Sequence, residues 1–110
     1  MEQIDYEACF RYIQNNSKKM GELEGDLIQL EGKLKATKAA LMDASDASSA
    51  AMKEVDSYRH PAYMEVVNEL AKATAMKTEL SIMIKAAFQK IETQRSQAYL
   101  ARQELKQLNG

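Results

Sequence analysis

This chain of 110 residues has little of what builds a disulfide-bonded or sheet-based core: one cysteine, one proline, two phenylalanines and no tryptophan. The lone Cys9 excludes an intrachain disulfide, and it lacks the neighbours that would make a metal site or an activated nucleophile. Alanine, leucine, methionine, lysine, glutamate and glutamine dominate instead, and these residues favour helices. The composition therefore predicts an all-α fold.

An excess of charge of one sign is also missing, since the formal net charge is −1, with 28% charged and 45% hydrophobic residues. This balance predicts a folded domain and gives no bulk electrostatic reason to expect nucleic acid or an anionic membrane as a partner. The N-terminal residues include Glu2 and Asp5 and no long apolar run, which predicts neither a signal peptide nor a membrane span. We expect a cytoplasmic location.

No catalytic signature is found in the sequence, which has no Gly-rich phosphate loop, no paired His and carboxylate at metal spacing and no nucleophile elbow. The single histidine, His60, precedes the single proline, and a turn-capping or exposed role outweighs an acid–base role there. We expect a protein that is not an enzyme and that holds no metal or cofactor.

The stretch from His60 to Asn109 predicts one long helix, because it contains no glycine and no proline after Pro61. Proline fits the first helical turn and pushes the preceding residue out of the α region, so the helix begins at His60-Pro61. Apolar residues then recur at alternating gaps of three and four, which is the heptad spacing of a coiled-coil seam. These seam positions are Leu70, Ala73, Leu80, Ile84, Ala87, Ile91, Ala98, Ala101, Leu105 and Leu108, with Lys77 and Gln94 as polar interruptions.

The first half of the chain carries a second heptad seam, which predicts a first helical arm. Its positions are Met20, Leu23, Leu27, Leu30, Leu34, Thr37, Leu41, Ala44, Ser48, Ala51 and Val55. Gly21, Gly25 and Gly32 lie inside this run and each costs up to about 1 kcal/mol of helix propensity, so a partner along the seam must hold the helix. The small residues at 43–51 allow either a break with a new N-cap or a close approach of two helices, and we prefer the second interpretation.

A short turn between two arms of similar length predicts an antiparallel helical hairpin. We expect a single domain over residues 1–110, with a first arm at about 3–57, a turn at about 58–61 and a second arm at about 61–108. Residue i then faces roughly residue 119 minus i, which places an acidic arm (net −4 over residues 1–32) against a basic one (net +3 over residues 81–110).

The core of such a coiled-coil hairpin is thin, so we expect a homo-oligomer. The seam residues expected to hold the hairpin or oligomer are Leu23, Leu27, Leu30, Leu34, Leu80, Ile84 and Ile91.

Two basic groups are candidate nucleic-acid contacts. The first arm has a local positive surface of Lys33, Lys35 and Lys38. The second arm has a stripe at helical spacing that consists of Arg95, Tyr99, Arg102 and Lys106. A sequence-tolerant single-strand binder uses such cations for phosphates and such a ring for a base. Alternatively, the two arginines pair with the acidic first arm while Tyr99 packs in the hairpin.

Two segments have a distinctive order of residues. Residues 31–41 form a Lys/Ala-rich run, EGKLKATKAAL, and residues 91–102 combine an isoleucine, a single arginine, an aromatic and another basic residue, IETQRSQAYLAR. Both resemble segments of the UvsY-type recombination mediators of tailed phages. The resemblance implies a small helical protein that binds single-stranded DNA, forms ring-like oligomers and helps a recombinase displace the single-strand-binding protein. The expected location is the host cytoplasm if the chain is phage-encoded. It also implies phosphate contacts for Lys33, Lys35, Lys38, Arg95 and Arg102, with Tyr99 stacking a base or holding the oligomer.

A protein–protein interaction module is the competing class. The aromatic residues of the first 15 positions and the exposed apolar residues would then dock on another protein, as in a phage inhibitor, a chaperone or a coiled-coil adaptor. We call this segment the aromatic start; its apolar and aromatic residues are Ile4, Tyr6, Cys9, Phe10, Tyr12 and Ile13. Affinity for single-stranded DNA that falls steeply with salt separates the two classes, because phosphate contacts release counterions.

Overall fold

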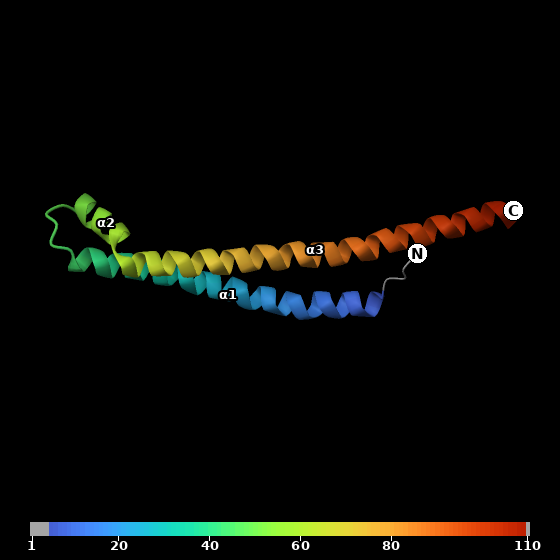
Figure 1. Ribbon diagram of the computed structural model, residues 1–110, viewed down its shortest axis with the longest axis horizontal. Coiled ribbons are helices and arrows are strands. Elements are labelled where there is room, and N and C mark those ends of the chain that lie inside the picture. Colours follow the sequence, from blue (N-terminus) through green and yellow to red (C-terminus); the bar gives the residue numbers. More distant parts are fainter. Residues whose placement is uncertain (1–4, 110) are drawn as a thin grey trace. The chain divides into compact units, whose positions relative to one another are not determined.

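The structure of the chain is a computed structural model that describes residues 5–109. Its elements are three helices, α1 (Tyr6–Ala44), α2 (Ala50–Arg59) and α3 (Pro61–Asn109), which Figure 1 shows with the short α2 between the two long helices in chain order. The described residues contain no strand, which confirms the predicted all-α fold. Ile4, the first residue of the predicted aromatic start, lies outside the described residues.

The chain divides into two compact units, and each long helix contributes a segment to both. We call residues 21–78 the turn unit, because they contain α2 and the adjoining parts of α1 and α3. We call residues 5–20 and 79–109 the terminal unit, which is built from the first part of α1 and the last part of α3.

α1 begins after Asp5, whose carboxylate accepts a hydrogen bond from the Ala8 backbone N–H at 3.1 Å and so caps the helix. The helix continues without a break through Asn16, whose side-chain amide donates to the Tyr12 carbonyl oxygen at 2.8 Å. Half-buried residues recur along α1 at alternating gaps of three and four. They are Tyr6, Cys9, Ile13, Asn16, Met20, Leu23, Leu27, Leu30, Leu34, Thr37 and Leu41. The seam of α1 therefore begins at Tyr6 rather than at the predicted Met20.

α1 ends at Ala44, so the expectation of one first arm to about residue 57 is wrong. Ser49 has an extended backbone (φ −126°, ψ 154°) and its hydroxyl oxygen accepts a hydrogen bond from the Met52 N–H at 3.2 Å, which starts α2. The Ser45 hydroxyl donates to the Asp56 carboxylate at 2.8 Å and ties the connecting loop to α2. A break with a new N-cap is therefore the correct interpretation of this segment, and the preferred one of close helix packing is wrong. Of the predicted seam positions past Leu41, Ala44, Ser48 and Ala51 are exposed and Val55 is half-buried.

α3 begins at Pro61, as predicted, and the residue before it closes the preceding helix. His60 has an extended backbone (φ −73°, ψ 136°), which the following proline favours. Its N–H donates to the Ser57 carbonyl oxygen at 3.2 Å, and its Nδ1 accepts from the Ala62 N–H at 3.0 Å. His60 therefore caps both α2 and α3, which confirms the turn-capping role expected for this histidine.

Two ion pairs join α1 to α3 within the turn unit. Lys77 Nζ lies 3.7 Å from Glu24 Oε1, and Lys33 Nζ lies 3.5 Å from Glu69 Oε2. The numbers of the two partners sum to 101 in one pair and 102 in the other, so the predicted pairing of residue i with 119 minus i is wrong in this unit. The reason is that the loop and α2 remove residues 45–60 from the arm.

Four apolar side chains are buried in the described part of the chain: Val66 and Ala73 in the turn unit, and Ala87 and Ile91 in the terminal unit. They belong to a heptad series on α3 in which every position as far as Ala98 is buried or half-buried, the polar Lys77 and Gln94 included. Its members are Val66, Leu70, Ala73, Lys77, Leu80, Ile84, Ala87, Ile91, Gln94 and Ala98. The last three predicted seam positions, Ala101, Leu105 and Leu108, are exposed.

Candidate nucleic-acid interface

The predicted stripe on α3 lies in the terminal unit, and its four side chains are exposed. Their spacings of four, three and four residues keep them on one side of the helix. The stripe consists of Arg95, Tyr99, Arg102 and Lys106. It therefore presents three cations and one aromatic ring to solvent.

A groove of about 560 Å³ lies between this stripe and the first turns of α1. Tyr6 and Phe10 line it from α1, where their spacing of four residues puts both rings on one face. From α3 it is lined by Arg95, Ala98, Tyr99 and Arg102. The groove thus combines three aromatic rings with two guanidinium groups.

The arginines of the groove do not pair with the acidic residues of α1 within the described residues. Arg95 Nη1 lies 3.8 Å from Glu92 Oε1 on its own helix, and both side chains are largely exposed. No ion pair of Arg102 is found among the described residues. An exposed pair such as that of Arg95 is weak and easily exchanged for another anion, so both guanidiniums can reach a ligand.

The lysine cluster of α1 lies in the turn unit and is largely used within the fold. Lys33 pairs with Glu69, as described above, and Lys38 Nζ lies 3.1 Å from Glu54 Oε1. Lys35 is exposed and has no ion pair with any described residue. Of the three lysines, Lys35 is thus the one without an ion pair among the described residues, while the pair of Lys33 with Glu69 is exposed like that of Arg95.

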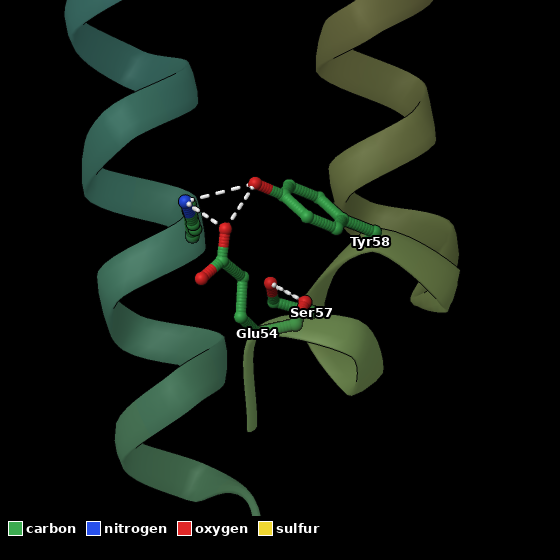
Figure 2. Close-up of polar contacts among 4 residues, drawn as sticks. Glu54, Ser57 and Tyr58 are labelled. Carbon is green, nitrogen blue, oxygen red and sulfur yellow. Dashed lines mark hydrogen bonds and ion pairs between the residues drawn. The ribbon is translucent and has the colours of Figure 1, made fainter. Parts of the chain in front are cut away.

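Lys38 belongs to a hydrogen-bonded network that joins α1 to α2. Its ammonium donates to the Tyr58 hydroxyl at 2.9 Å and to Glu54 at 3.1 Å, and the Tyr58 hydroxyl donates to the Glu54 carboxylate at 2.6 Å. Figure 2 shows the Tyr58 hydroxyl directed at the Glu54 carboxylate, next to the hydrogen bond from the Ser57 hydroxyl to the backbone. The Lys38 ammonium also lies 5.0 Å from the centre of the Tyr58 ring. The edge-to-face contact of this ring with the ring of Tyr63 on α3 has a distance of 5.2 Å between ring centres.

The network shifts the titration of its two charged members in opposite directions. The hydrogen bonds with Tyr58 and then Glu54 raise the pKa of Lys38 above its ordinary value. The hydrogen bonds from Tyr58 and then Lys38 lower the pKa of Glu54. Both groups are therefore charged at neutral pH, and the ammonium of Lys38 has partners within the fold.

The predicted seam residues are less exposed than the stripe. Leu23, Leu27, Leu30, Leu34, Leu80 and Ile84 are half-buried, and Ile91 is buried. Their part in an oligomer stays a prediction. Cys9 is half-buried, at the edge of an apolar groove that also includes Tyr12 and Met83.

Within residues 5–109, no group of three or more His, Cys, Asp or Glu side chains is placed to hold a metal ion. No helix in this range is long and apolar enough to cross a membrane. Comparison of the chain with protein families, with curated proteins and with solved structures found no match. Function must therefore follow from the chain's own geometry and chemistry.

Proposed function

We propose that this protein binds single-stranded DNA with low sequence specificity, through the groove of the terminal unit and the stripe beside it. The observation that carries the proposal is the combination of three rings with two guanidiniums in one groove, together with an Arg102 that has no ion pair among the described residues. Arginine planes and aromatic faces suit a single strand because every base has a face to stack and every nucleotide has a phosphate.

The spacing of the two arginines supports contacts to more than one phosphate. Arg95 and Arg102 are seven residues apart on one helix, which corresponds to about 10 Å along the axis. Lys106 extends the stripe by one further turn. A flexible strand can follow such a row of cations, and its affinity should fall with salt as counterions are released.

In this proposal the two long helices form an antiparallel hairpin and several copies assemble. The two ion pairs of the turn unit support the hairpin, because the sequence number falls on α1 as it rises on α3. The small number of buried apolar side chains among the described residues supports assembly. Several copies acting on one strand would bind far more tightly than one copy does. The wider role is that of a mediator that assists recombinase loading, with a recombinase or single-strand-binding protein as a further partner.

The test is charge reversal in the groove. The double variant Arg95→Glu/Arg102→Glu should lower the affinity for single-stranded DNA at least tenfold and reduce the slope of log affinity against log salt by about 1.4, at about 0.7 for each single-strand contact. Lys72→Glu/Lys85→Glu is the matched control, because it changes the net charge equally at exposed lysines that lie outside the groove.

Circular dichroism checks that both variants remain helical. Equal loss of affinity in the two variants would contradict a local site. No binding by the unmodified protein at low salt would contradict the function.

A second candidate is a coiled-coil protein–protein module, and the end of α3 favours it. Leu105 and Leu108 continue the heptad seam but are 58% and 82% exposed. A second copy of the chain is the occupant that the homo-oligomer would supply. Self-association that persists at high salt, without affinity for DNA, would favour this candidate.

A further inference from the structure

We infer that Tyr6 and Phe10 of α1 form, with Tyr99 of α3, a slot that stacks a base of the bound strand. This inference rests on the proposed function and adds the ligand group that the groove recognises. The proposed function names the rings and guanidiniums of the groove together, and strand binding would survive without stacking through the phosphate contacts of the arginines alone. The geometry of the groove assigns the bases a place of their own.

The lining of the groove is mainly aromatic. Tyr6 and Phe10 line it from α1, and Tyr99 lines it from α3 beside the small side chain of Ala98. Arg95 and Arg102 line the same groove, where their planar guanidiniums can stack on a base or hold its phosphate. A flat ring joined to an anion fits this arrangement, and a nucleotide of a flexible strand has both parts.

The exposure of Phe10 and Tyr99 argues against a purely structural role for these two rings. Phe10 lies one position past the seam residue Cys9 and is 47% exposed, whereas Ile91 in the same unit is only 2% exposed. Burying a half-exposed phenylalanine face is favourable, so a base that covers it gains free energy without any sequence requirement. A duplex keeps its bases stacked inside, so it cannot offer this contact without unstacking.

The chain contains a matched control for this ring. Phe88 is 49% exposed, belongs to the terminal unit and does not line the groove. Phe88→Leu therefore removes an aromatic ring of equal exposure without touching the slot. Phe10→Leu and Tyr99→Leu remove rings of the slot and keep apolar side chains.

The experiment compares two probes of equal length and charge: a 20-nucleotide oligo-dT and its abasic deoxyribose-phosphate counterpart. The unmodified full-length protein should bind oligo-dT about tenfold more tightly than the abasic probe. Phe10→Leu and Tyr99→Leu should each remove most of this preference while leaving the affinity for the abasic probe within twofold. Phe88→Leu should keep the preference.

The outcomes separate the inference from the function on which it rests. Equal binding of the two probes by the unmodified protein would overturn the slot and leave a phosphate-binding function in place. A preference that Phe88→Leu reduces as much as Phe10→Leu would also overturn it. Absence of binding to either probe at low salt would overturn the proposed function itself. Equal helicity of the variants by circular dichroism shows that each comparison concerns folded protein.

Discussion

Lys38 donates hydrogen bonds to Tyr58 and Glu54, so this cation of the predicted interface already has partners within the fold. Its charge alone made it a phosphate-contact candidate, but its partners lie 16 and 20 residues away in the sequence. Arg102 differs from Lys38, since no described acidic side chain pairs with it. At the scale of single residues, the function of a cation thus depends on whether the fold already supplies an anion.

We predict that Tyr58→Phe raises the pKa of Glu54 and lowers the pKa of Lys38, because it removes the hydroxyl that is the largest cause of both shifts. NMR titration of the Glu54 side-chain carboxyl carbon and the Lys38 ammonium measures the two pKa values. Tyr63→Phe is the control, because Tyr63 contributes a ring contact to the network and its hydroxyl forms no hydrogen bond among the described residues. Unchanged pKa values in Tyr58→Phe would contradict the assigned cause.

The same network predicts how stability depends on pH. The lowered pKa of Glu54 gives a contribution that is fully present above the ordinary pKa of glutamate and is lost as pH falls through the lowered value. The raised pKa of Lys38 gives a contribution that is present below the ordinary pKa of lysine and is lost as pH rises through the raised value. Thermal melting of Glu54→Gln and the unmodified protein should therefore differ at neutral pH and converge in strong acid. A difference that is constant down to strong acid would contradict the linkage.

At the scale of helices, local patterns predicted most of the structure. The start of α3 at Pro61 follows from the fixed geometry of proline, and the heptad positions from Met20 to Leu41 and from Leu70 to Ala98 follow from local periodicity. The break before Ser49 was one of two interpretations of its segment but not the preferred one, because small residues suit a cap as well as a close helix contact and only tertiary packing decides between the two.

The expectation of a single first arm, without a separate α2, also made the predicted register wrong at the candidate site. The predicted register of 119 minus i places Tyr6 opposite a position beyond the last residue, Gly110. The spacing of Tyr6 and Phe10 was visible in the sequence, and so was the arginine stripe. Their meeting in one groove was not, because it depends on how many residues the turn consumes.

We predict that the buried seam residues of α3 stabilise the terminal unit and that its exposed apolar residues contribute little. Ile91→Ala should lower the free energy of unfolding by about 3 kcal/mol, because Ile91 is 2% exposed and its removal leaves a cavity. Ile82→Ala should change it by less than about 0.5 kcal/mol, because Ile82 is 62% exposed. Urea unfolding followed by circular dichroism measures both. Similar costs for the two variants would show that the seam is placed wrongly.

For the whole molecule, the buried apolar surface is small. Four apolar side chains are buried among residues 5–109, while Leu105 and Leu108 occupy seam positions in solvent. Where a heptad series continues past its last buried position, its remaining apolar residues are exposed and can pack against a further helix. The balance between buried and exposed seam positions is the physical reason to expect assembly.

We predict that the protein sediments as an oligomer at micromolar concentration. The double variant Leu105→Ser/Leu108→Ser should reduce the size of this oligomer. The double variant removes apolar surface only at exposed seam positions, so helicity within the protomer should be retained. Leu100→Ser is the control, because Leu100 is comparably exposed but lies off the seam. A monomer in the unmodified protein, or an equal effect of Leu100→Ser, would contradict the prediction.

The two connections between helices differ in how they would accept an inserted sequence. At His60 one residue ends α2 and begins α3, so each added residue would separate the two caps and rotate α3 by about 100° relative to α2. In the loop at 45–49, Ser49 caps α2 alone and Ser45 bonds to Asp56 from the other end of the loop, and the exposed Asp46 and Ser48 lie between them. An affinity tag or a fluorophore-bearing peptide therefore belongs between residues 46 and 48, where the chain can lengthen without changing the direction of either neighbouring helix.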